Sequence, residues 1–226
     1  MAIEITGEPR RVMLPKRTQD GRRVELSYTI VPTTHGKLVM FDRFAKKLQP
    51  GDILARLASM PQTAGRSPVH RVNVGNLQLF VKQGERGFNL HPLREALVLE
   101  DLHYNGIRCE PPVAVFLYKN YESKPWTESL WKHALVTVGS RNLPKTFGVG
   151  TMLETEVGRK ISDLGYSANS DLQAVGRLKP RVVIDVEGLS PTFRFKAVKP
   201  LRIERRARLL LREAFRTRPQ KKKIKK

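Results

Sequence analysis

The feature that most constrains the fold is a pair of short alternating runs around a two-residue turn. "VHRVNV" and "LQLFVKQ", within residues 69–83, carry apolar side chains at alternate positions, as a strand with one buried face does. Gly75 and Asn76 separate the two runs, and both residue types tolerate the positive φ angles of a tight turn. The segment therefore predicts a β-hairpin in an antiparallel sheet.

Other segments predict further strands and several helices. Apolar runs predict strands at 25–32, 113–118, 133–138 and 181–186. Residues 36–52 predict a short strand that runs into a helix ended by "PGD", and 52–59 fits either a strand or a helix. Helical patterns occur at 91–107, 151–166 and 200–216. Residues 1–24 resemble a basic arm, and the whole predicts an α+β fold.

Composition limits the class of protein. With 226 residues, 40% of them hydrophobic, the chain can bury a substantial core. No apolar run approaches the ~20 residues that span a bilayer, and the N-terminus lacks the apolar core of a secretory signal. The single cysteine, Cys109, excludes an internal disulfide and fits a reducing compartment, so we expect a cytoplasmic protein.

The charge predicts a polyanionic partner. Lys and Arg number 42 against 21 Asp and Glu, a net charge of +21, and residues 201–226 hold twelve basic and two acidic residues. Such a field attracts RNA, the ribosome or another polyanion. The residues expected to make this contact lie on the helix 200–216 and in the tail after it: Arg205, Arg208, Arg212, Lys221, Lys222 and Lys223.

The helix at 200–216 is amphipathic. Its apolar face is expected to hold Ile203, Ala207, Leu210, Leu211 and Ala214, with arginines on the other face. We expect the apolar face to pack on the domain. Attachment to an anionic membrane is a weaker alternative, because that face carries little aromatic surface.

A lysine and a glutamate form the first candidate site. Lys82 lies in the middle of an apolar strand, and Glu95 shares a helix face with Leu99 and Leu102, at i, i+4 and i+7. A charged glutamate on such a face is costly to bury unless a cation meets it, and Lys82 is the nearby candidate. A lysine on an edge strand and a glutamate at a helix margin remain the simpler alternative.

Three carboxylates form the second candidate. Asp171 precedes the strand at 181–186, and Asp185 and Glu187 lie at that strand's end, before Gly188. Carboxylates brought together repel one another unless a metal or a proton lies between them, and hard oxygen ligands suit Mg²⁺. An ordinary surface turn remains the alternative.

The order of these parts resembles the protein-kinase-like superfamily. "LFVKQ" is similar to its lysine strand and "LREALVLEDL" to the helix that carries the partner glutamate. The resemblance implies a two-lobed fold, with an antiparallel N-lobe sheet, an αC-type helix and a much reduced C-lobe. It makes Lys82 the contact for the α- and β-phosphates and Glu95 the partner of that lysine.

The resemblance also implies ATP and Mg²⁺ as cofactors. "SDLQ" is similar to the catalytic loop, which makes Asp171 the candidate base, and "IDVEG" to the metal-binding segment, which makes Asp185 a Mg²⁺ ligand. Glu187 matches the second acid of the small-molecule kinases, and Gly65 lies where a phosphate-covering loop belongs. The implied activity is phosphoryl transfer to an unknown acceptor.

The size of the chain fits the minimal members of this superfamily. Only 41 residues follow Asp185, and the chain is similar in size and basic C-terminus to RIO-type kinases and the small kinase of the KEOPS complex; lipopolysaccharide-core kinases are also minimal. The domain boundaries expected on this basis are a basic N-terminal extension at 1–50, an N-lobe at 51–138, a reduced C-lobe at 139–218 and a disordered basic tail at 219–226.

Two departures keep other functions open. Gly176 stands where the family has an asparagine as second metal ligand, and Asn169 where it has a histidine. Phosphoryl transfer depends mostly on metal ions that neutralise the charge of the phosphates, so the loss of a metal ligand affects the expected kinase activity. The alternatives are a catalytically inactive pseudokinase and a non-enzymatic basic protein that binds RNA or the ribosome.

Overall fold

The computed structural model describes residues 2–17, 23–60, 69–84, 92–119, 133–139, 145–148, 155–168, 172–176, 182–186, 189–191 and 198–216. The helices within these ranges are α1 (Pro50–Ala58), α2 (Pro92–Tyr104), α4 (Glu156–Asp163) and α5 (Val198–Phe215). The strands are β1 (Arg10–Arg17), β2 (Arg23–Thr33), β3 (Gly36–Phe41), β4 (Val69–Val74), β5 (Leu77–Gly84), β6 (Pro112–Tyr118), β7 (His133–Val138), β8 (Lys145–Phe147), β9 (Tyr166–Ala168), β10 (Gln173–Gly176), β11 (Val182–Asp185) and β12 (Leu189–Pro191).

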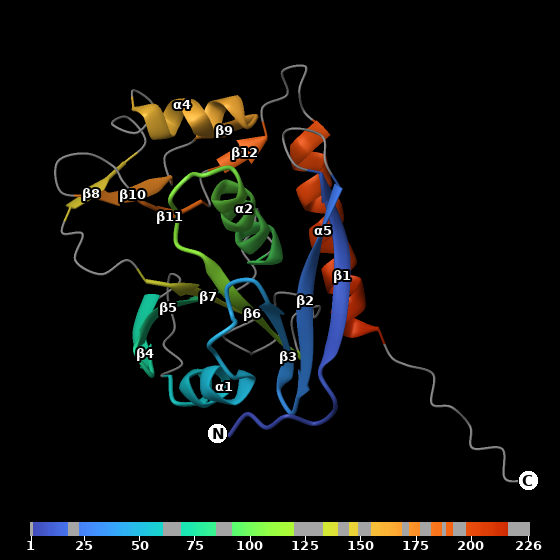
Figure 1. Cartoon of the computed structure of the whole chain (residues 1–226). Coiled ribbons are helices and arrows are strands. Elements are labelled where there is room, and N and C mark those ends of the chain that lie inside the picture. The colour runs from blue at the N-terminus through green and yellow to red at the C-terminus, as the bar shows by residue number, and fades with distance from the viewer. Residues whose placement is uncertain are drawn as a thin grey trace, which may run out of the picture.

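A seven-stranded antiparallel sheet forms the centre of the described structure (Figure 1). Its strand order is β1-β2-β3-β6-β7-β5-β4. The predicted hairpin is confirmed as β4 and β5, and Gly75 takes the positive φ of 54° that its turn needs. The strands expected at 113–118 and 133–138 are confirmed as β6 and β7, which lie side by side in the sheet.

The N-terminal region is part of this sheet, whereas the sequence predicts an arm and a separate extension. β1 pairs with β2 along its whole length, from Arg10 opposite Ile30 to Arg17 opposite Arg23. Val12, Leu14 and Lys16 are partly or fully buried, and the residues between them are exposed. The inward-facing Lys16 and the outward-facing Met13 hide this alternation in the sequence. Residues 10–41 therefore supply three of the seven strands.

Helices cover both faces of the sheet. α2 and α5 pack against one face in a core that includes Tyr28, Leu97 and Leu210. α1 packs against the other face, where Ile53 and Leu57 share a second core with Val136. The "PGD" expected to end a helix instead begins α1, because proline fits the first turn of a helix, where its missing N–H has no partner to lose. None of the described helices is long and apolar enough to cross a membrane.

The C-terminal part adds two small sheets on the α2 side. β11, β10 and β8 form one, and β12 pairs with β9 in the other. The Val183 N–H donates to the carbonyl of Arg108 and the Glu110 N–H donates to the carbonyl of Val183, both at 3.0 Å. These bonds attach β11 to the segment that leads from α2 into β6.

The α+β class and the antiparallel sheet agree with the sequence prediction. The helices expected at 91–107 and 200–216 are confirmed as α2 and α5, and that expected at 151–166 is shorter, as α4. The division into two lobes stays a prediction.

Candidate functional site

Lys82 and Glu95 form an ion pair between the sheet and α2. Lys82 Nζ lies 3.4 Å from Glu95 Oε1. The lysine side chain is 18% exposed and the glutamate 6% exposed. The pairing predicted from the helix face of Glu95 is therefore confirmed, and the edge-strand alternative is wrong, because β5 lies between β4 and β7.

Side chains alternate between the two faces of β5, and this alternation places Lys82 on the face that α2 covers. Leu79 and Val81 are buried in the core on the α1 side, so Lys82 faces the opposite side of the sheet. Leu135, its cross-strand partner on β7, belongs to the core shared with α2. A charge in such surroundings is held by its partner, and removing one member of a buried pair costs about 3–5 kcal/mol.

Asp185 is the last residue of β11, a strand that packs in the core on the α2 side of the seven-stranded sheet. Its Cα is opposite Gln173 of β10, so a hairpin leads directly to it. Val183 and Val186, on either side of it in the chain, are buried in the core that contains α2. Asp185 therefore lies at the end of a strand that packs in the same core as α2, the helix that carries Glu95.

Several predicted site residues lie outside the described residues. These are Gly65, Asn169, Asp171, Glu187 and the tail residues Lys221, Lys222 and Lys223. Gly176 is described as the last residue of β10, opposite Lys145 of β8. Groups of three or more metal-binding side chains do not occur among the described residues.

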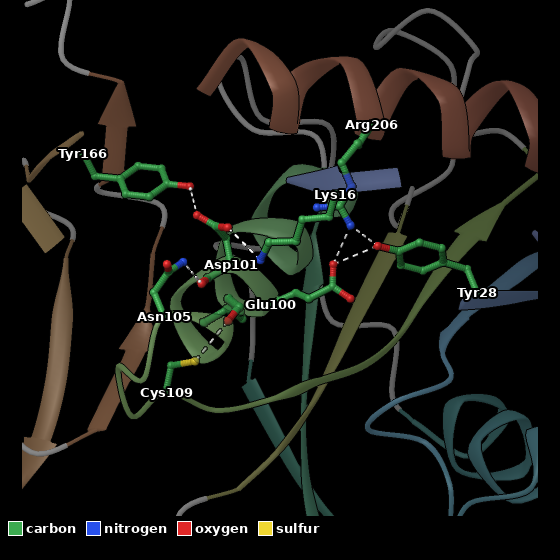
Figure 2. A network of polar contacts seen from close by, with 9 residues as sticks. Lys16, Tyr28, Glu100, Asp101, Asn105, Cys109, Tyr166 and Arg206 are labelled. Carbon is green, nitrogen blue, oxygen red and sulfur yellow. Dashed lines mark hydrogen bonds and ion pairs between the residues drawn. The ribbon is translucent and has the colours of Figure 1, made fainter. Parts of the chain in front are cut away.

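A buried network of polar side chains surrounds α2 and was not predicted from the sequence (Figure 2). Glu100 Oε2 accepts a hydrogen bond from the Tyr28 hydroxyl at 2.8 Å and pairs with Arg206 at 2.7 Å. Arg206 also donates to the Tyr28 hydroxyl. One carboxylate on α2 thus binds β2 and α5 at once.

The next residue of α2 makes a second, similar set of contacts. Asp101 Oδ1 lies 2.8 Å from Lys16 Nζ of β1, and Asp101 Oδ2 accepts a hydrogen bond from the Tyr166 hydroxyl of β9 at 3.1 Å (Figure 2). Lys16 Nζ also lies 4.1 Å from the centre of the Tyr104 ring, a cation–π contact. The two acids together connect α2 to β1, β2, β9 and α5.

Burial sets the protonation of these groups. It raises the pKa of Tyr28 and of Tyr166 well above the usual tyrosine value, and the neighbouring carboxylates add to the effect. Burial lowers the pKa of Lys16, opposed by Asp101. Burial by itself would lower the pKa of Arg206, but Tyr28 and Glu100 more than offset it, so that pKa is raised.

Helical periodicity could have revealed part of this network. Arg206 lies three residues after Ile203 and four before Leu210, which places it on the apolar face of α5 and not on the outer one. Its burial corrects the expectation that the arginines of this helix all face outwards. Leu211 is only partly buried, whereas Ile203, Ala207, Leu210 and Ala214 are buried as predicted.

Cys109 is a buried, protonated thiol. Burial raises its pKa to about 12, and the thiol donates a hydrogen bond to the carbonyl of Leu99 at 3.1 Å. Because the thiolate is the nucleophile, burial and a raised pKa make this residue a poor candidate for a catalytic nucleophile.

Comparisons with known proteins give no further assignment. No protein-family model matches the chain, and neither the curated proteins nor the solved structures contain a significant match. The resemblance to kinases therefore depends on the residues and their arrangement alone.

Proposed function

We propose that this protein binds ATP with Mg²⁺ in the manner of a minimal kinase and transfers a phosphoryl group to an acceptor not yet known. The observation that carries the proposal is the ion pair between Lys82 and Glu95. In protein kinases, a strand lysine paired with a glutamate of the following helix is required for the active arrangement.

The order of elements supports the same function. The lysine strand β5 is followed by α2 with Glu95, by the paired strands β6 and β7, and by a hairpin that ends at Asp185. Lys82 of β5 pairs with Glu95 of α2, and Val183 of β11 packs in the core that contains α2. This arrangement is consistent with a shared nucleotide site.

Each predicted residue has a role in this proposal. Lys82 would contact the α- and β-phosphates, and Glu95 would hold its ammonium group in place. Asp185 and Glu187 offer hard carboxylate oxygens, which fit Mg²⁺, and the ion would neutralise charge on the phosphates. Asp171 would orient the acceptor hydroxyl, and Gly65 would lie in the loop over the phosphates.

Nucleotide binding and catalysis are separate claims. Gly176 cannot supply the side-chain ligand that an asparagine gives to a second metal ion. A protein that binds Mg-ATP and does not turn it over would be a pseudokinase. One that does not bind it would be a non-enzymatic basic protein.

A thermal-shift titration with Mg-ATP tests binding. At one hundred times Kd, a ligand that binds only the folded state stabilises it by about 2.7 kcal/mol. For a chain of this length that corresponds to a rise in Tm of roughly 5–11 °C. We expect Lys82→Met to lose most of this shift, because the phosphates lose their cation.

Lys46→Met is the matched control. It removes an exposed lysine from the segment that packs on the other face of the seven-stranded sheet, away from α2. It should keep the full shift. No shift of the wild-type Tm at millimolar Mg-ATP would refute the proposal. Release of ADP, abolished by Asp171→Asn with binding intact, would separate an active kinase from a pseudokinase.

A further inference from the structure

The outer face of α5 carries a row of arginines. Arg205, Arg208 and Arg212 are exposed on α5, and Arg216 is exposed directly after its last residue; spacings of three, four and four residues place them on one side of the helix. At 1.5 Å per residue the row is about 16 Å long. We propose that this row binds the sugar–phosphate backbone of a nucleic acid, independently of whether the chain binds ATP.

The row is held on a rigid support. The opposite side of α5 is buried against α2 and the sheet through Ile203, Ala207, Leu210 and Ala214. Arg206, which is absent from the outer row, ties the helix to Glu100. A fixed helix loses little conformational freedom when it binds a ligand, so the row is pre-organised.

Acidic neighbours neutralise only part of the row. Glu204 pairs with Arg208 at 3.5 Å and Glu213 pairs with Arg216 at 3.5 Å. Arg205 and Arg212 form no ion pair within the part of the chain that the structure describes. Residues 198–216 hold seven basic residues against two acidic ones, which leaves an excess of positive charge.

The chemistry of the face favours phosphate over a membrane or a protein. Guanidinium groups bind phosphate oxygens through two parallel hydrogen bonds. A membrane-bound helix inserts its apolar face, but that face of α5 is buried, and Leu209 is the only exposed large hydrophobic side chain among the described residues of α5. Protein interfaces are commonly anchored by aromatic side chains, and Phe215 is the single aromatic residue of α5.

The same face predicts binding without base recognition. Phe215, the one aromatic residue of α5, is partly buried and packs against the core, so the row offers no fully exposed ring on which a base could stack. Contacts to phosphates fix position and carry no sequence information. RNA and DNA of equal length should therefore bind similarly, and the affinity should fall steeply with salt.

The test uses fluorescence anisotropy with a single-stranded RNA 20-mer of mixed sequence, the matching DNA, and anionic vesicles, at several salt concentrations. The full chain is compared with the triple variant Arg205→Gln, Arg208→Gln and Arg212→Gln. The control is Lys46→Gln, Lys47→Gln and Arg56→Gln. These control residues are exposed and belong to the segment that packs on the opposite face of the sheet, so both variants lose the same charge.

We expect the α5 variant to bind RNA at least about tenfold more weakly at 50 mM salt and the control variant less than about threefold more weakly. The slope of log affinity against log salt should fall by about 2, because each phosphate contact on a single strand contributes about 0.7. A chain lacking residues 217–226 should keep the difference between the two variants.

Three results would overturn the proposal. Equal losses in the two triple variants would mean that overall charge, and not the row, attracts the RNA. Full RNA affinity in the α5 variant, with loss on removal of 217–226 alone, would assign binding to the tail. Vesicle binding that depends on the row while RNA binding does not would assign the row to lipids.

Discussion

Arg206 occupies a position that helical periodicity assigns to an apolar residue. It is buried on α5 and pairs with Glu100 at 2.7 Å, while the Tyr28 hydroxyl contacts both. The carboxylate on α2 therefore depends on a guanidinium from a helix more than 100 residues later in the chain. A buried charge without its partner is costly, so this single side chain is important for stability.

Arg206→Met should destabilise the protein by about 3–5 kcal/mol, because Glu100 is left as a buried charge. Arg205→Met is the matched control, since that arginine is exposed on the next position of the same helix and should change stability by less than about 0.5 kcal/mol. Urea unfolding followed by circular dichroism measures both. Adding Glu100→Gln to Arg206→Met should restore part of the loss, and no restoration would contradict the assigned pair.

At the scale of elements, α5 is the clearest amphipathic unit. Leu210 is fully buried and its neighbour Leu209 is 36% exposed, so two adjacent leucines of one helix differ in environment. Because α5 packs on α2 and the sheet, its inner side chains stabilise the core that also holds Leu99, which lies on the same face of α2 as Glu95.

Leu210→Ala should therefore lower the free energy of unfolding by about 2–5 kcal/mol, through lost burial and the cavity left behind. Leu209→Ala should lower it by well under half as much, since an exposed leucine loses little contact. Similar losses in the two variants, measured by the same urea titration, would mean that α5 does not pack as described.

Elements with a local signal could be predicted, and long-range pairings could not. The β4–β5 hairpin, α2 and α5 follow from alternation, turn residues and helical spacing. The pair Lys82–Glu95 was found because the two residues lie thirteen positions apart on consecutive elements. Tyr28 and Arg206 are 178 positions apart, and no local pattern reports such a contact. The place of β1 in the sheet escaped prediction for a different reason: it pairs with the next strand along the chain, but its alternation is hidden by an inward-facing lysine and an outward-facing methionine.

At the scale of the whole molecule, buried tyrosines make stability sensitive to alkaline pH. Burial raises the pKa of Tyr28, Tyr118 and Tyr166, so the folded state keeps these protons above pH 10, where the unfolded chain releases them. The folded state then binds more protons than the unfolded state, and stability falls as the pH rises above 10. Lys16, whose pKa is lowered, acts in the opposite direction, but only up to its unfolded value of about 10.5.

We therefore expect part of the tyrosine absorbance change near 295 nm to appear only as the protein unfolds at alkaline pH. The chain has five tyrosines, so a late step of several residues is separable from the early one. Tyr166→Phe should remove one tyrosine from the late step. A single early titration, completed while the circular dichroism is still native, would contradict the described burial.

The contact between Tyr28 and Arg206 also has a consequence for synthesis on the ribosome. A chain growing at 5–20 residues per second takes roughly 9–36 s to pass from the first of these residues to the second. Within that interval α2 is completed and can pack on the first strands, but α5 is still missing from the same face. The core on that face is therefore complete only after α5 has been made.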